Sequence, residues 1–351
     1  MEELMQRRSD LAIEAVAQFI GEASGEIKGI VKQEETVDEL IVTCIDVLKG
    51  YEKKIGKKAG RYLSIDTSQL GLDTADKLEQ TRKVFSTELQ KLLSYKKIKD
   101  DATCLIIGLG NEQITPDALG PMTVDNVIVT RHLYEMNLME QDPDYREVSA
   151  LVPGVMGLTG IETYDIIESV VKKVKPDFLV VVDALAARAV TRVNKMIQMT
   201  DTGISPGSGV GNRRRKIDEE SLGIPVIAIG IPTVVDAVSV THDTIDLLIK
   251  HLGRSLMSRE DGRHDYSVLD DEKGEDVDLE VSDANVRKEL LGKVGMLSKE
   301  EKRQLLAEVL TPAGHNLIVT PKSIDSEMED LSRLISNALN VALHPRIAFS
   351  A

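Results

Sequence analysis

The first hundred residues change their hydrophobic period twice. Residues 9–23 carry apolar side chains at helical spacing, and Ser9 or Asp10 can cap the helix. From about residue 25 to residue 66, apolar and polar residues alternate with a period of two between turns rich in glycine and lysine. Residues 74–95 return to helical spacing. The pattern predicts a helix, an antiparallel meander and a second helix.

The middle of the chain contains three short runs that are apolar at nearly every position. They are TCLIIGLGN at 103–111, DFLVVVDAL at 177–185 and PVIAIGIPT at 225–233. Strands buried on both faces have this pattern, which is typical of a parallel sheet covered by helices. Helical patterns separate or follow them at 121–139, 160–175 and 241–252. This alternation predicts an α/β domain over roughly residues 97–255.

The C-terminal third begins with a polar and acidic segment, residues 257–288, which reads as a long surface loop. Residues 298–310 begin with Ser298 followed three positions later by Glu301, the pattern of a helix capping box. A final helix is expected at about 321–343, after a proline.

These patterns together predict an α/β fold class: a mostly parallel sheet layered between helices, with an N-terminal antiparallel β-region and C-terminal helices. We expect four segments along the chain. They are an N-terminal region at 1–96, an α/β core at 97–255, an acidic surface loop at 256–288 and a helical region packing on the core at 289–351.

Composition excludes several classes of protein. No apolar run of the 351-residue chain approaches the ~18–20 residues of a membrane span, and the N-terminus lacks the pattern of a secretion signal. Cys44 and Cys104 both lie in apolar, strand-like runs, which favours reduced thiols in a cytosolic protein. The net charge of −15 argues against nonspecific nucleic-acid binding, and a chain without Trp has few aromatic platforms for bases.

Aspartates follow the predicted strands at the edge where ligands collect in parallel sheets. Asp117 follows the first run, and Asp183 ends the second. If their strands are neighbours, one carboxyl group can donate a proton while the other accepts one, as water attack on an amide requires. The same pair could instead hold a divalent metal together with His242. Both residues also have simpler interpretations, Asp183 as the cap of a helix at 184–195 and Asp117 as a turn former.

Further candidates for substrate binding are weaker. The glycine-rich run at 201–212 could present backbone N–H groups to a peptide, and the basic run at 213–216 could bind an acidic partner or simply be solvated. Arg188, a turn after Asp183, could hold acidic groups of a substrate or form a structural salt bridge. These considerations select Arg188, Gly207, Gly209, Gly211 and Arg213. No histidine pair has the spacing of a structural zinc site, so we expect no metal and no cofactor.

Six stretches carry a resemblance to a known family. They are SDLAIEA, IGLGNEQITPDALGP, VPGVMGLTGIET, VVDALAAR, DTGISPGSGVGN and GIPVIAIGIPTVVDAV. In this order they resemble the spore germination proteases, which initiate degradation of small acid-soluble spore proteins. The resemblance extends to LAEVLTPAGHNLIVTPK near the C-terminus.

The resemblance implies an atypical, metal-free aspartic endopeptidase whose catalytic aspartates are Asp117 and Asp183. It also implies a homotetramer, made as a zymogen that removes an N-terminal prosegment by self-cleavage, in the interior of the developing spore. Only about residues 1–8 precede the SDLAIEA stretch, so the expected prosegment is short. No direct contact with nucleic acid or with a membrane is expected.

A more distant likeness leaves an alternative open. Hydrogenase-maturation endopeptidases also show a GxGN turn followed by an acidic residue, with another acidic residue at the end of a later strand. In those enzymes the acidic pair and a histidine contact nickel, so a related fold and a metal-dependent endopeptidase form the main alternative. A non-catalytic scaffold that binds peptides is the second alternative.

Overall fold

The structure is a computed structural model that describes most of the chain. The described residues are 9–22, 28–138, 144–206, 215–260, 292, 294–310 and 317–344. They belong to two compact units. The larger comprises Arg8–Val235 and Thr320–Ala351, and the smaller comprises Met1–Arg7 and Asp236–Val319. Within the described residues, no helix has the length and apolar character needed to cross a membrane.

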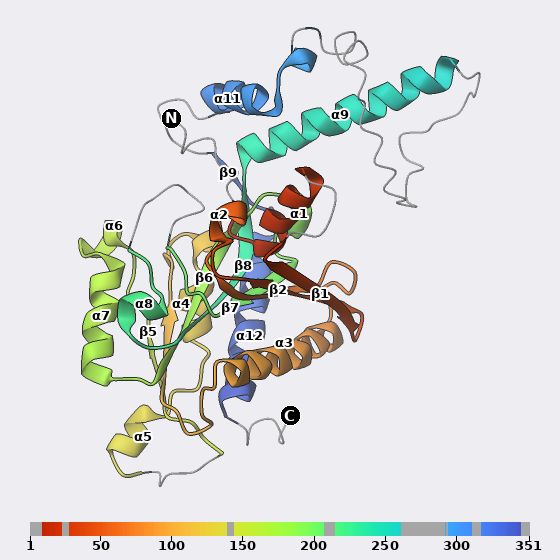
Figure 1. Ribbon diagram of the computed structural model, residues 1–351. Helices are drawn as coiled ribbons and strands as arrows, with labels where there is room; N and C mark the ends of the chain where they lie inside the picture. Colours follow the sequence, from red (N-terminus) through yellow and green to blue (C-terminus); the bar gives the residue numbers. More distant parts are fainter. Residues whose placement is uncertain are drawn as a thin grey trace. The chain divides into compact units, whose positions relative to one another are not determined.

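The larger unit is built on one mixed sheet with the strand order β1-β2-β3-β7-β8-β6-β4-β5 (Figure 1). Strands β8, β6, β4 and β5 are parallel, whereas β1, β2, β3 and β7 pair antiparallel, and β7 joins the two parts by pairing antiparallel with β8. The predicted α/β class, with a parallel core and an N-terminal antiparallel region, is confirmed. The strands are β1 (Ile30–Val37), β2 (Leu40–Val47), β3 (Gly60–Asp66), β4 (Cys104–Gly108), β5 (Val148–Leu151), β6 (Phe178–Ala187), β7 (Met196–Thr200) and β8 (Val226–Asp236).

Two strands of this sheet have no counterpart in the prediction. β5 is only four residues long and mostly half-buried, so it shows neither alternation nor a long apolar run. β7 reads MIQMT and is fully buried, although it contains a glutamine and a threonine. Its pairing with β3 carries the antiparallel meander into the same sheet as the parallel strands.

Helices cover both faces of the sheet. They are α1 (Ala12–Glu22), α2 (Glu52–Ile55), α3 (Ala75–Tyr95), α4 (Leu119–Val124), α5 (Arg131–Glu135), α6 (Met156–Thr159), α7 (Thr163–Val174), α8 (Glu219–Leu222) and α12 (Ile324–Leu343). The helix expected at 121–139 is instead two short ones. The run Val127-Ile128-Val129-Thr130 separates them, because its β-branched side chains disfavour a helix.

The alternation of β6 distributes its side chains between two cores. Val180 and Val182 pack in the main core with α3, α4 and α12, whereas Leu179 and Val181 pack with α7. Helix α1 covers the antiparallel strands, through a third cluster that includes Ile45 and Tyr62. Because strand side chains alternate, Asp183 lies on the α7 face of the sheet.

The smaller unit contains α9 (Ala237–Glu260), a short 3-10 helix η5 (Val294–Met296), α11 (Lys299–Leu310) and β9 (Ile318–Val319). Helices α9 and α11 pack against each other. The predicted capping box is confirmed, since the Ser298 amide donates to Glu301 at 2.8 Å and the Glu301 amide donates to the Ser298 hydroxyl at 3.1 Å. The predicted acidic loop begins inside α9, and its residues 261–288 lie outside the described part. The segment boundaries at 96, 255 and 288 stay predictions.

Candidate functional site

Asp183 is the first residue of β6 beyond the end of β4. The last pair between these two parallel strands joins Gly108 to Val182, and the Leu109 amide then donates to the Val182 carbonyl at 2.8 Å. On the other side of β6, Asp183 pairs with Gly230 of β8. The strand continues to Ala187, so the interpretation of Asp183 as the cap of a helix at 184–195 is wrong. Only 7% of Asp183 is exposed.

Asp117 ends the short 3-10 helix η2 (Thr115–Asp117), which follows the turn after β4. The Asn111 amide donates to the Oδ2 atom of Asp117 at 2.8 Å and to its carbonyl oxygen at 3.1 Å. From β8, the buried Thr233 hydroxyl donates to the Pro116 carbonyl at 2.6 Å. The turn is therefore held by the chain directly after β4 and by β8, and η2 lies against β6.

Two glycines let this turn approach the strand ends. Gly110 has φ of +118°, and a Cβ atom there would lie 1.9 Å from the Asp117 carbonyl oxygen. A Cβ atom on Gly120 of α4 would lie 2.2 Å from the Leu109 oxygen and 2.6 Å from the Val182 oxygen. Asp117 thus follows β4, and Asp183 lies in the neighbouring strand β6 at the point where β4 ends.

Comparison with known proteins identifies the relatives of the chain. The model of the family described as germination protease matches residues 7–350. The chain belongs to the germination protease family. Germination proteases of Priestia megaterium and Bacillus subtilis are each 46% identical to it, over 350 and 349 residues, which is 97% of this chain and 94% of each relative. The family assignment made from six motifs is confirmed, and the protein is a peptidase.

Among solved structures, the chain is similar to a [NiFe] hydrogenase maturation protease, HycI, from Thermococcus kodakarensis. The identity is 20%, and the match covers 41% of this chain and 80% of that chain with a TM-score of 0.27. This neighbour is a hydrogenase-maturation protease, the class of enzyme that the GxGN turn suggested. A TM-score this low supports no argument about the site.

Of the remaining candidate residues of this germination protease, the structure describes only Arg188. Gly207, Gly209, Gly211 and Arg213 lie outside the described residues. Arg188 is not a helical turn after Asp183, because the chain between them is extended. Its main-chain amide donates to the carboxylate of Glu14 at 2.8 Å, and the amide of Ala189 donates to the same carboxylate at 3.0 Å. The basic run is partly engaged within the protein, since Arg215 pairs with Asp165 at 2.8 Å.

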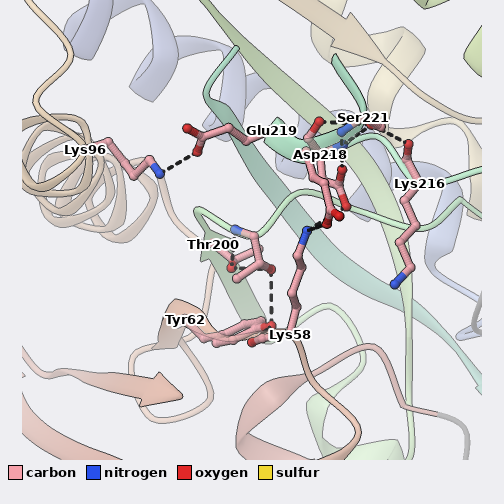
Figure 2. A network of polar contacts seen from close by, with 10 residues as sticks. Lys58, Tyr62, Lys96, Thr200, Lys216, Asp218, Glu219 and Ser221 are labelled. Atoms are coloured by element: carbon pink, nitrogen blue, oxygen red, sulfur yellow. Dashed lines mark hydrogen bonds and ion pairs between the residues drawn. The ribbon is translucent and has the colours of Figure 1, made fainter. Parts of the chain in front are cut away.

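The structure describes the residues on either side of the glycine-rich segment, and several of them belong to a polar network (Figure 2). Ile204 and Ile217 form an isolated antiparallel bridge that closes the segment. Asp218 caps α8 and forms an ion pair of 2.9 Å with Lys58, which precedes β3. The neighbouring Glu219 pairs with Lys96, at the end of α3, at 2.8 Å (Figure 2). The chain directly after the segment is thus tied to the residues that precede β3 and follow α3.

Tyr62 in this network should make stability fall at alkaline pH. Its buried hydroxyl donates to the Lys58 carbonyl at 2.8 Å, and burial raises its pKa from 10.0 to about 12. Because the pKa is higher in the folded state, the neutral hydroxyl contributes to the free energy of unfolding. This contribution is fully present below the unfolded pKa of about 10 and is lost as the pH rises through about 12. Tyr62→Phe should cost about 1 kcal/mol at about pH 9, the value of one hydrogen bond.

Between about pH 9 and pH 11 the difference in unfolding free energy between Tyr62→Phe and the parent should change by about 1.4 kcal/mol in favour of the variant, and so reverse its sign, because only the parent has a titrating group at position 62. Urea unfolding of both proteins at the two pH values measures this change. A difference that is independent of pH would contradict the raised pKa.

His242, the third residue of the metal alternative, belongs to the smaller unit. Its Nδ1 atom lies 3.5 Å from a carboxylate oxygen of Asp243 and 3.5 Å from one of Asp246, and Lys302 pairs with Asp246 at 2.8 Å. In the described part of the chain, no three His, Cys, Asp or Glu side chains are grouped so that they could hold a metal ion.

Sequence reasoning missed the residues that hold the two strand ends. Asn111 was visible as the last residue of the GLGN motif, but its role depends on the turn that folds Asp117 back onto it. Thr233 had no signal, because its hydrogen bond reaches a carbonyl 117 positions away in the chain. Glu14 likewise contacts the end of β6 from α1.

Proposed function

We propose that this protein is an endopeptidase that initiates degradation of small acid-soluble spore proteins during spore germination, with Asp117 and Asp183 as its catalytic dyad. One observation carries the proposal: Asp117 follows β4, and Asp183 lies in the neighbouring parallel strand β6 at the point where its pairing with β4 ends. Family membership supports the peptidase activity and suggests the spore proteins as substrates.

The dyad would share two tasks in hydrolysis. One carboxylate, ionised, takes a proton from water as the water oxygen attacks the scissile carbonyl carbon. The other carboxyl group, protonated, donates a hydrogen bond to the carbonyl oxygen. The proton gained by the first carboxylate passes to the leaving amine when the C–N bond breaks, so the dyad ends with the protons it began with. A coupled pair of carboxyl groups titrates as a unit, so the two roles belong to the dyad as a whole.

The family also suggests how the activity is controlled. We propose that the protein is made as a self-processing zymogen whose prosegment includes about residues 1–8, which lie outside the described part, and that it acts as a homotetramer in the spore interior. A native mass near 154 kDa, four times the chain mass of 38.6 kDa, would support the tetramer.

Cleavage of a purified small acid-soluble spore protein, with and without a chelator, tests the proposed function. We expect cuts at defined internal bonds, equal rates with and without chelator, and no cuts in an unrelated folded protein. Loss of cleavage with chelator, restored by nickel or zinc, would favour the metal-dependent alternative. Binding of the spore protein without any cleavage, also after acid treatment to release a zymogen, would favour the peptide-binding scaffold.

A further inference from the structure

Strand β6 has an edge that β4 leaves uncovered. Its pairing with β8 continues to Ala187 and Val235, whereas its pairing with β4 stops at Val182. Alternate N–H and C=O groups of β6 beyond this point face the side on which β4 has ended, and an edge of this kind can pair with another extended segment. This edge begins at Asp183.

The chain's own N-terminal segment occupies this edge. The Asp10 amide donates to the Ala186 carbonyl at 3.0 Å, and the Ala186 amide donates to the Asp10 carboxylate at 2.9 Å. Asp10 thereby satisfies both main-chain groups of a residue three positions beyond Asp183, much as a paired strand would.

Two side chains, one from the loop before β3 and one from β7, hold the main chain of the same segment. The ammonium group of Lys57 donates to the carbonyls of Ser9 at 3.1 Å and Asp10 at 2.8 Å. The Gln198 side chain donates to the Asp10 carbonyl at 3.1 Å and accepts from the Ala12 amide at 2.6 Å. All four contacts are to main-chain atoms, so they do not depend on which side chains the segment carries.

Gln198 lies in line with Asp183 across the sheet. It pairs with Gly230 of β8, and Gly230 pairs with Asp183 of β6, so the three residues form one row. Residues paired across neighbouring strands present their side chains to the same face. Gln198 is therefore on the face of Asp183, separated from it by a residue without a side chain, and only 6% of Gln198 is exposed.

We propose that the β6 edge beyond Asp183, together with Lys57 and Gln198, binds the main chain of the substrate peptide, and that residues 9–12 occupy this position in the structure. The proposal rests on the function proposed above and adds the residues that position the peptide. Pairing of an extended peptide with an open strand edge is a common mode of recognition, and its affinity comes from main-chain hydrogen bonds. The peptide and residues 9–12 compete for one edge.

The first test is whether loosening residues 9–12 strengthens peptide binding. The probe is a fluorescein-labelled peptide of the chain's own residues 5–16, MQRRSDLAIEAV, and the protein is the full chain with Asp117→Asn. Adding Asp10→Ala removes the carboxylate that binds the Ala186 amide. We expect the peptide to bind about tenfold more tightly by fluorescence polarisation, the size of one hydrogen bond to a charged group.

Asp76→Ala, on the exposed start of α3, is the matched control and should leave the affinity unchanged. If Asp10→Ala leaves peptide affinity unchanged or lowers it, residues 9–12 do not compete with the peptide and the proposal fails.

The second test uses the protein that carries both Asp117→Asn and Asp10→Ala. In this protein residues 9–12 compete less with the peptide, so the contributions of Gln198 and Lys57 to peptide binding can be measured. Adding Gln198→Met or Lys57→Met to it should weaken peptide binding about tenfold each, because each removes two main-chain hydrogen bonds. Lys53→Met on α2 is the control. Unchanged affinity in both variants would overturn the proposal, and the partly exposed Lys57 keeps the test valid if the Gln198 variant does not fold.

Peptide affinity should rise with Asp10→Ala and fall with Gln198→Met or Lys57→Met, and this difference in direction separates a peptide-binding role from a structural one. A structural role alone would lower thermal stability in all three variants without strengthening peptide binding in any. Mass spectrometry of the peptide after each titration checks the proposed function independently. Cleavage by a protein carrying Asp117→Asn would contradict the dyad, whereas unaltered affinities would contradict only the proposed edge.

Discussion

Asp117→Asn and Asp183→Asn should each lower kcat/KM for cleavage of a small acid-soluble spore protein by at least about 10³-fold, with the fold retained. The amide has nearly the shape of the carboxylate but cannot take a proton from water, and positioned acid–base groups contribute about 10²–10⁴-fold to rates. Because the two groups act as a unit, the double variant should be little worse than either single one.

Initial rates, with thermal unfolding of each variant, measure this prediction. The matched control is Asp330→Asn, on the exposed face of α12, which should cleave at the parent rate. If either dyad variant retains a rate close to that of the parent, the assignment of the dyad is wrong. An inactive variant that is also unfolded is replaced by the corresponding Glu variant, which keeps the charge and moves it by one methylene group.

Gly120→Ala should destabilise the protein by at least about 3 kcal/mol, at the upper end of the usual cost of overpacking. The new methyl group would meet backbone oxygen atoms of Leu109 at 2.2 Å and Val182 at 2.6 Å. Leu109, directly after β4, is hydrogen-bonded to Val182 of β6, so the two cannot move independently. Relief of the clash would separate α4 from the strand ends, so activity should fall as well.

Gly157→Ala on α6 is the control, because a Cβ atom there meets nothing within 4 Å. Urea unfolding of both variants, with their cleavage rates, measures the difference. A Gly120→Ala protein as stable as Gly157→Ala would show that α4 is not held against the ends of β4 and β6.

The sequence was most informative where a pattern is repeated along one element. The runs that lead to Gly108 and to Asp183 are apolar at nearly every position because both faces of their strands are covered, and this identified Asp117 and Asp183 as the carboxylates that follow the apolar runs. The sequence did not show that β6 continues past Asp183 to Ala187. The antiparallel meander and the long α3 were equally readable, since each shows its period over seven residues or more.

What could not be read depends on contacts between distant parts of the chain. β7 carries Gln198 inside a fully buried strand, and this glutamine hydrogen-bonds to the main chain of Asp10 and Ala12. Likewise, no local pattern shows that Thr233 reaches Pro116 or that β3 finds its partner in β7. Such pairings are decided by the packing of the whole sheet.

The order of the chain in the sheet bears on how the protein forms during synthesis. β3 is made early, but its partner β7 follows about 130 residues later, and the face of α3 is completed only by α12, the last helix of the described chain. Buried side chains of α12 such as Met328, Leu331 and Ile335 complete a core whose first strands are made at the start. A nascent chain that lacks α12 therefore exposes apolar surface, and the main core closes only when the C-terminus leaves the ribosome.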